Sequence, residues 1–163
     1  MRVGITGHQR LDEPANWAWV RKEMDRVLVS LPRPLIGISS LAIGADQVFA
    51  NAVLERGGTL EVIVPFVGYE STFSEQHDRQ AYLCFLASAS RVDVLERDRT
   101  DQESYFASGK IMIDRSELVI AVWNGKPALG FGGTGDIVAN ALEHNKRVVQ
   151  INPATKRVTA IGV

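Results

Sequence analysis

The chain has 163 residues, enough for one domain with a sizeable core and too few for two comfortable ones. Hydrophobic residues make up 45% of it and charged residues 23%, a composition that excludes an intrinsically disordered protein. The formal net charge of −1 gives no general attraction to nucleic acid or to an anionic membrane, and no local basic patch stands out. The sequence therefore carries no strong signal for a nucleic-acid partner, and we expect no membrane partner.

Short runs rich in β-branched residues alternate with segments of helical periodicity. In chain order, the predicted elements are a strand at 1–6, a helix at 12–31, a strand at 35–38, a helix at 45–56, a strand at 60–64, a helix at 75–89, a short strand at 91–95, a helix at 104–115, a strand at 118–123, a helix at 137–144 and a strand at 147–151. Asp12 is expected to cap the first helix, and the charged residues 96–101 are expected to form a solvated loop.

This alternation is typical of βαβ units, which build a parallel sheet covered by helices. We predict a single α/β domain over residues 1–163, with a doubly wound, Rossmann-like and mainly parallel sheet that has helices on both faces. In such sheets, ligands bind beyond the carboxyl ends of the strands, near a switch in strand order. That rule brings three loops to one edge, at residues 7–10, 39–46 and 130–136.

The segment 130–136 reads Gly-Phe-Gly-Gly-Thr-Gly-Asp and connects a predicted strand to a predicted helix. A glycine-rich turn of this kind leaves backbone N–H groups unpaired at the helix start, where the peptide dipoles also favour an anion. Glycine also lets a ligand oxygen approach the backbone closely. The segment predicts a phosphate-binding loop, with a tight ligand-free connection as the alternative.

The residues predicted to bind the ligand come from all three loops: Gly7, His8, Arg10, Ser39, Ser40, Gly44, Gly132, Gly133, Thr134 and Gly135. Thr134 lies inside the glycine loop and is expected to contact a phosphate. Arg10 could pair with a phosphate or close a salt bridge. The hydroxyls of Ser39 and Ser40 suit either a helix cap or a phosphate contact.

Two carboxylates near the helix starts, Asp46 and Asp136, are the candidate catalytic residues. Each could stabilise the first turn of its helix through the dipole, contact a ribose hydroxyl, or serve as a general acid or base on a glycosidic bond. Tyr69, Phe73 and His77 lie near the end of the third strand, where they could stack on a base or simply pack against one another.

Several other chemistries find no support in the sequence. No cluster of His, Cys or carboxylate residues has zinc-ligand spacing, so no metal site is predicted. The glycine loop lacks the Lys-Ser/Thr pair of a Walker motif, and no G-x-G-x-x-G follows the first strand. The sequence therefore leaves the cofactor unknown.

The single cysteine, Cys84, can form no internal disulfide, which is typical of a reducing compartment. Its apolar neighbours at 82–86 predict a small buried core residue and not a nucleophile. No apolar run approaches the ~20 residues of a membrane span, and residues 1–6 are too few for a signal-peptide apolar region. We expect a cytoplasmic protein.

Taken together, the loops resemble the SLOG superfamily, which groups the DprA-type DNA-processing proteins, the LOG phosphoribohydrolases and the YpsA-like proteins. The matching segments cover most of the chain: G-I-T-G-H-Q-R at 4–10, S-S-L-A-I-G-A-D at 39–46, V-I-V-P-F at 62–66 and G-G-T at 132–134. The resemblance implies a Rossmannoid fold that binds nucleotides or nucleotide-derived ligands, with the phosphate at the glycine loop.

The likeness to the two better-defined branches is incomplete. LOG enzymes carry P-G-G-x-G-T-x-x-E, whose glutamate serves cleavage of the N-glycosidic bond. Aligned on the paired glycines, this chain places Phe131 at the proline, Asp136 at the threonine and Ala139 at the glutamate. DprA-type proteins act on single-stranded DNA, whereas this chain lacks the basic, aromatic-rich surface that such binding uses.

Three functional hypotheses follow. The first is binding of a nucleotide or phosphorylated nucleoside derivative, as a sensor or carrier. The second is an enzyme, a nucleotide N-glycosidase that uses Asp136 or Asp46 in place of the missing glutamate. The third is an assembly module that forms a homo-oligomer, because Trp17 and Trp19 cannot both lie on one face of their helix.

Overall fold

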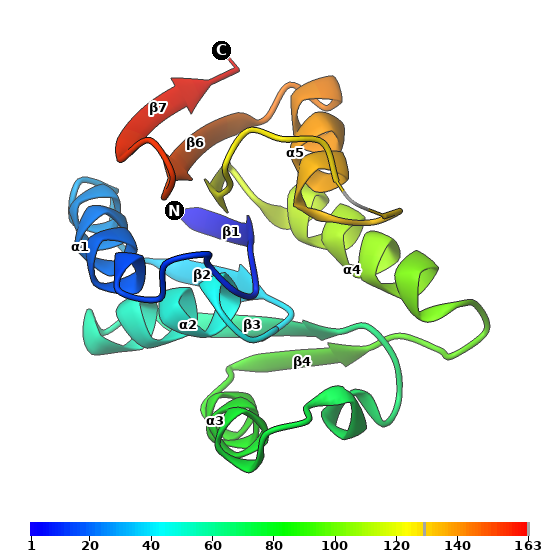
Figure 1. Ribbon diagram of the computed structural model, residues 1–163. Coiled ribbons are helices and arrows are strands. Elements are labelled where there is room, and N and C mark those ends of the chain that lie inside the picture. The colour runs from blue at the N-terminus through cyan, green and yellow to red at the C-terminus, as the bar shows by residue number, and fades with distance from the viewer. Residues whose placement is uncertain (129, 163) are drawn as a thin grey trace.

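The computed structural model describes residues 1–128 and 130–162 (Figure 1). Its strands are β1 (Arg2–Gly7), β2 (Ile36–Ser39), β3 (Thr59–Val64), β4 (Arg91–Val94), β5 (Leu118–Val122), β6 (Arg147–Asn152) and β7 (Arg157–Ile161). Its helices are α1 (Asn16–Val29), α2 (Ala45–Glu55), α3 (Gln76–Ala87), α4 (Asp101–Arg115) and α5 (Thr134–Glu143), with a short 3₁₀ helix, η1 (Tyr69–Thr72).

The strands form one seven-stranded sheet in the order β4-β3-β2-β1-β5-β6-β7. All neighbouring pairs are parallel except β6 and β7, which form an antiparallel hairpin. Helices α1 and α2 pack on one face, and α4 and α5 pack on the other (Figure 1). The predicted doubly wound, mainly parallel α/β fold is confirmed.

Strand β5 shows why the sequence folds in this way. Leu118, Ile120 and Val122 join the core beneath α1 and α2, whereas Val119 and Ala121 join the core beneath α4 and α5. Successive side chains of a strand point to opposite faces, so a strand buried on both faces reads as a continuous apolar run. Burying each of the larger side chains contributes roughly 1.5–3 kcal/mol.

The strand order places a topological switch between β1 and β5. From β1 the chain builds β2, β3 and β4 outward in one direction, and it then returns to add β5 on the other side of β1. Gly7 at the end of β1 pairs with Val122 at the end of β5. Their following loops diverge to opposite sides of the sheet, which is how doubly wound folds open a crevice.

Two elements were not predicted. Segment 67–74, which lies between the predicted strand at 60–64 and the predicted helix at 75–89, contains η1. Strand β7 was missed because most of its residues are exposed, so burial imposes no alternating pattern on its sequence. The turn before β7 is organised by the side chain of Asn152, which accepts hydrogen bonds from the backbone N–H groups of Ala154 and Thr155.

Three local predictions were wrong. Helix α1 begins at Asn16 without a side-chain cap, so Asp12 does not cap it. Helix α4 begins at Asp101, within the segment expected to be a loop, because Thr100 and Glu103 form a capping box. Cys84 is exposed, since α3 covers the sheet edge beside β4 and buries only Tyr82.

Candidate functional site

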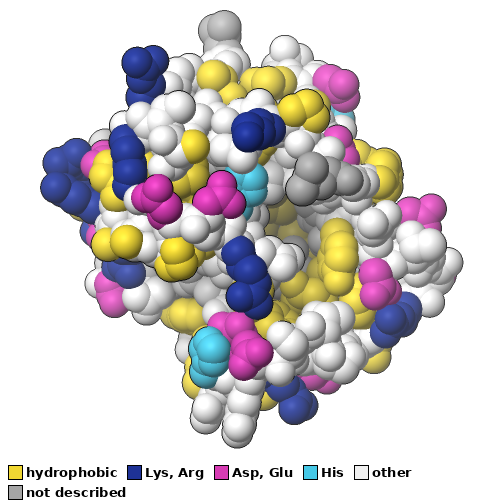
Figure 2. All heavy atoms as spheres, in the orientation of Figure 1, with side chains coloured by type: hydrophobic (Ala, Val, Ile, Leu, Met, Phe, Trp, Pro, Cys, Tyr) yellow, Lys and Arg dark blue, Asp and Glu magenta, His cyan; other side chains and the backbone are white. Residues whose placement is uncertain are grey.

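A pocket of about 690 Å³ opens at the carboxyl ends of the central strands. It is lined by the end of β1, the loops that follow β2, β3 and β5, and one face of α4. Figure 2 shows the hollow, with hydrophobic side chains in its wall. Its volume lies within the range of small-molecule sites, and its position is the one that the strand order predicts.

All three predicted loops reach this pocket, although not through every predicted residue. The predicted residues that line it are Gly7, His8, Ser40, Asp46, Gly132, Gly133, Thr134 and Gly135. Four others, Arg10, Ser39, Gly44 and Asp136, lie outside the lining. Arg10 is exposed, and the other three hold the loops in shape, as described next.

The loop after β1 presents His8 to the pocket. Its Nε2 accepts a hydrogen bond from the backbone N–H of Asn124, 3.1 Å away, so the neutral ring carries its proton on Nδ1. Burial lowers the pKa of His8, and the negative charge of Asp12 opposes this only in part. His8 therefore lines the pocket as a neutral imidazole at pH 7.

Gly44 supports this loop from below. Its φ is +81°, and a Cβ at this position would lie 2.4 Å from the backbone oxygen of Gln9. The backbone N–H of Ala45 also donates to the His8 carbonyl oxygen at 3.1 Å. Gly44 is therefore required for close packing of two loops, which differs from its predicted role in ligand contact.

The loop after β2 positions Asp46 in the first turn of α2. The hydroxyl of Ser39 donates to Asp46 Oδ2 at 2.9 Å, and the backbone N–H of Ser40 donates to the same oxygen at 3.1 Å. Ser39 is fully buried, so it serves the loop by holding the carboxylate. Burial raises the pKa of Asp46 to about 6, against the hydrogen bonds that favour the charged form.

The glycine loop leads into α5, whose N-cap is Gly133. Asp136 Oδ2 accepts a hydrogen bond from the backbone N–H of Gly132 at 2.8 Å, so this carboxylate closes the loop onto itself. Gly132 has a φ of +81°, and a Cβ there would lie 2.8 Å from the backbone oxygen of Gln102. Within residues 1–128 and 130–162, the backbone N–H groups of Thr134 and Gly135 have no hydrogen-bond acceptor.

Sequence reasoning missed the contribution of α4. Gln102, Tyr105, Ser108, Gly109 and Met112 line the pocket at helical spacing. The helical spacing of these residues was visible in the sequence. Nothing in the sequence, however, indicated that this helix packs beside the carboxyl edge of the sheet. The mixture of polar and apolar residues along one stripe of α4 is the sequence feature that could have indicated its part in the pocket.

The loop after β5 adds an aromatic ring and a cation. Phe131 lines the pocket and is 55% exposed, with its ring centroid 5.0 Å from that of Phe106. Lys126 is the only Lys or Arg among the described lining residues. Its backbone is held in place because its carbonyl oxygen accepts a hydrogen bond from Trp123 Nε1 at 2.7 Å.

The aromatic residues after β3 are packed together. The ring of Tyr69 makes edge contacts with Phe66, Phe73 and Tyr82, at centroid distances of 5.6, 5.3 and 5.6 Å. His77 is largely exposed, pairs with the neighbouring Asp78 and does not line the pocket. Of the two alternatives predicted for Tyr69, stacking on a base or packing against other aromatic residues, its ring shows the packing. Tyr69 nevertheless also lines the pocket.

Among the described residues, no group of three or more His, Cys, Asp or Glu side chains is arranged to hold a metal ion. No helix in the same part of the chain is both long and apolar enough to cross a membrane.

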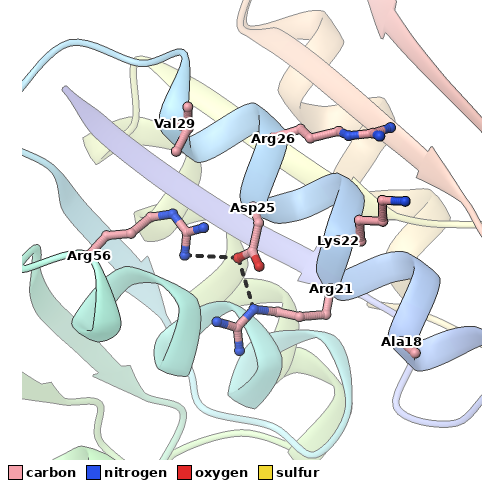
Figure 3. A pocket seen from close by; sticks show the side chains of 7 residues that line it. All are labelled: Ala18, Arg21, Lys22, Asp25, Arg26, Val29 and Arg56. Carbon is pink, nitrogen blue, oxygen red and sulfur yellow. Dashed lines mark hydrogen bonds and ion pairs between the residues drawn. The ribbon is translucent and has the colours of Figure 1, made fainter.

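A second hollow, of about 430 Å³, lies over α1 and the end of α2 (Figure 3). Most of its charges are paired: Asp25 Oδ1 accepts from Arg21 Nε at 2.8 Å and lies 2.9 Å from Arg56 Nη1. Lys22 and Arg26 point away from this carboxylate (Figure 3), and Arg26 pairs with Glu23. The ion pairs tie α1 to the end of α2 and leave no convergent binding group.

No protein-family model and no curated protein sequence matches the chain. Solved structures do. DNA processing protein A from Streptococcus pneumoniae is similar over 91% of this chain and 49% of its own, with 17% identity and a TM-score of 0.63. DNA processing protein A from Helicobacter pylori, described with a single-stranded DNA binding mode, is similar over 92% of this chain and 64% of its own, with 16% identity and a TM-score of 0.64.

A third solved structure, of a protein designated TM1055, is similar over 90% of this chain and 71% of its own, with 15% identity and a TM-score of 0.54. These likenesses show a shared fold, a Rossmann-like α/β domain, in agreement with the resemblance to the SLOG superfamily. The chain spans about half the length of the S. pneumoniae protein and 64% of the H. pylori protein.

Proposed function

We propose that the protein binds a nucleotide or a phosphorylated nucleoside derivative in the pocket at the carboxyl edge of its sheet, as a sensor or carrier. The observation that carries this proposal is the start of α5, where Thr134 and Gly135 line the pocket and their backbone N–H groups have no acceptor in the described chain. Unpaired N–H groups and the helix dipole together favour a phosphate. Lys126 adds a positive charge to the same lining.

The rest of the pocket suits the nucleoside part of such a ligand. Phe131 presents an exposed ring at the pocket wall, supported from behind by Phe106. Stacking of a base on an aromatic side chain contributes about 1–3 kcal/mol. The polar groups on the β1–β3 side of the pocket are available for the sugar.

Titration calorimetry with mononucleotides, dinucleotides and cyclic nucleotides tests the proposal. A ligand at a hundred times its Kd should stabilise the protein by about 2.7 kcal/mol, so thermal shifts provide a second readout. The variant Thr134→Glu places a negative charge where the phosphate is proposed to bind, yet an acid in a first helical turn is favourable for folding. It should remove binding without loss of stability.

The matched control is Ala139→Glu, which adds the same charge at an exposed position of α5 that does not line the pocket. It should leave binding intact. If correctly folded protein binds none of these compounds, or if Thr134→Glu binds them as tightly as the unaltered protein, the proposal is wrong.

A nucleotide N-glycosidase is the second candidate, and the raised pKa of Asp46 favours it, because a carboxyl that titrates at about 6 suits general acid-base chemistry. Asp136 fits less well, since it is bonded to the backbone of its own loop outside the lining. Release of free base from a nucleoside monophosphate, lost in Asp46→Asn while binding persists, would support the enzyme. Binding with no turnover in the unaltered protein would exclude it for that compound.

A single-stranded nucleic acid is a third candidate ligand, because the H. pylori protein with the same fold is described with a single-stranded DNA binding mode. Fluorescence anisotropy with a labelled oligonucleotide measures this directly. Binding that weakens steeply with salt would favour a strand, since phosphate contacts release counterions. The pocket contains few cations, so we expect mononucleotides to compete effectively if a strand binds.

A homo-oligomer also remains a proposal. Trp17 and Trp19 are both partly buried against the core, and the Lys156 ammonium lies 5.1 Å from the ring centroid of Trp19. Light scattering of Trp17→Ala and Trp19→Ala tests whether either ring also contributes to a subunit contact. An unchanged mass for both variants would remove this hypothesis.

A further inference from the structure

Three polar side chains line the pocket on the β1–β3 side although each is more than nine-tenths buried. Thr6 is 8% exposed, Asp46 is 7% exposed and Tyr69 is 4% exposed. They come from the end of β1, the start of α2 after β2, and the segment after β3, three neighbouring strands of the sheet. We call Thr6, Asp46 and Tyr69 the polar cluster.

The polar cluster has hydrogen-bonding capacity that the protein does not use. Within the described part of the chain, neither the Thr6 hydroxyl nor the Tyr69 hydroxyl makes a hydrogen bond. The Ser39 hydroxyl and the Ser40 backbone N–H both donate to Asp46 Oδ2, and the backbone N–H groups of Leu41 and Ala42 also act on this carboxylate to lower its pKa. A carboxylate has about four lone-pair sites, so the group can still accept a hydrogen bond from a ligand. Among the described residues, the fully buried side-chain atoms without a partner are Arg56 Nε and Ser104 Oγ, so the Thr6 and Tyr69 hydroxyls still reach the pocket space, where they can bond to water or to a ligand.

The chemistry of the polar cluster matches a vicinal diol. An ionised carboxylate accepts hydrogen bonds only, whereas hydroxyl groups both donate and accept. A sugar hydroxyl can donate to Asp46 and accept from Tyr69 or Thr6 at the same time. Burial is the main cause that raises the pKa of the Tyr69 hydroxyl, and the negative charge of Asp46 raises it further.

We propose that the polar cluster binds the ribose 2′- and 3′-hydroxyls of the ligand, with Tyr69 as the residue that makes the pocket prefer ribonucleotides to deoxyribonucleotides. This inference rests on the proposed nucleotide-binding function and names the sugar. It assigns opposite walls of one pocket to opposite ends of the nucleotide: the phosphate to the start of α5, and the diol to the β1–β3 side. Loss of one hydroxyl leaves a buried polar group unpaired.

Calorimetry with the four ribonucleoside 5′-monophosphates and their 2′-deoxy and 3′-deoxy counterparts tests the inference. An unpaired buried donor or acceptor costs about 1–3 kcal/mol, so each deoxy compound should bind roughly 5–150-fold more weakly. Tyr69→Phe keeps the ring that packs against Phe66, Phe73 and Tyr82 and removes only the hydroxyl. The Tyr69→Phe variant should bind ribonucleotides about 5–10-fold more weakly and deoxynucleotides nearly as tightly as the unaltered protein. The ratio of the two affinities should therefore be smaller in the variant.

Tyr82→Phe is the matched control, because Tyr82 belongs to the same aromatic group but does not line the pocket. It should bind like the unaltered protein. Thr6→Val, which replaces a hydroxyl by a methyl of similar volume, provides an independent variant if Tyr69→Phe does not fold.

The outcomes separate the two proposals. Ribonucleotides and deoxynucleotides bound equally well, or both weakened alike by Tyr69→Phe, would overturn the sugar assignment and leave nucleotide binding standing. Binding of none of the compounds would overturn both. A preference for ribonucleotides that narrows in Tyr69→Phe and Thr6→Val, and not in Tyr82→Phe, is the expected result.

Discussion

Replacing Asp46 by Asn should make the protein more stable near neutral pH. Burial raises the pKa of Asp46 from its ordinary value of 3.8 to about 6, so the folded state holds the proton more tightly than the unfolded chain. Each pKa unit corresponds to about 1.4 kcal/mol, and the shift therefore represents about 3 kcal/mol. The ionised carboxylate weakens the fold by roughly that amount.

The sign of the pH dependence follows from linkage. Because the folded state binds the extra proton, the stabilisation from protonated Asp46 is complete below a pH of about 4 and is lost as the pH rises to about 6. Asn has nearly the same shape, never ionises, and offers an oxygen to the hydrogen bonds from Ser39 and Ser40. The variant should therefore gain up to about 3 kcal/mol at pH 7.5 and almost nothing at pH 4.

Urea denaturation of both proteins at pH 4 and pH 7.5 measures this difference, and the m-values show whether the unfolded states are comparable. A gain of 3 kcal/mol corresponds to a rise in Tm of about 6–12 °C for a chain of this size. Other groups titrate equally in both proteins, so only the difference between them is informative. If Asp46→Asn is less stable at pH 7.5, or differs by the same amount at both pH values, the carboxylate has a structural role that this reasoning omits.

Three further substitutions test other features of the structure. Glu61→Gln removes the charge from a bidentate pair with Arg2, whose hydrogen bonds hold the pKa of Glu61 below its ordinary value. The variant should lower the free energy of unfolding by about 1–2 kcal/mol at pH 7. In urea titrations this loss should disappear as the pH falls well below 4.5, because Glu61 is then protonated in both folded and unfolded states. Gly44→Ala forces a Cβ to within 2.4 Å of a backbone oxygen at a φ of +81° and should lower Tm far more than Gly57→Ala, where φ is +68° with nothing within 4 Å. Thr100→Ala removes the cap of α4 and should lower the free energy of unfolding by about 1 kcal/mol, with unchanged stability counting against the capping box.

The parallel core of the fold could be predicted from the sequence because burial on both faces leaves an unmistakable pattern. The run at 118–123 is apolar throughout, and the helices between such runs show a clear period. Where burial does not constrain the sequence, this signal is lost. Strand β7 is exposed along most of its length and pairs with β6 at the edge of the sheet, with Ile161 packed against the core, so burial marks little of its sequence.

The site was predictable as a set of loops but not as a set of side chains. The rule on strand ends brought residues 7–10, 39–46 and 130–136 together, because the backbone topology alone decides which loops meet. Which groups point into the pocket depends on tertiary contacts that leave no trace in the local sequence. Ser39 turns to the Asp46 carboxylate and Gly44 packs against the first loop, so neither lies in the pocket lining, although both were predicted to bind the ligand.

The structure separates the two candidate catalytic acids, Asp46 and Asp136, by their surroundings. Both lie in the first turn of a helix that follows a strand, and the same alternatives were predicted for both. Asp136 uses Oδ2 to accept the Gly132 N–H at 2.8 Å and lies outside the pocket lining, so its task is to shape the glycine loop. Asp46 is buried at the pocket wall, where its Oδ2 accepts hydrogen bonds from the Ser39 hydroxyl and the Ser40 backbone. A strongly shifted carboxyl at a pocket wall is a candidate for a functional group, so experiments on function should begin at Asp46 and not at the loop that resembles the LOG motif.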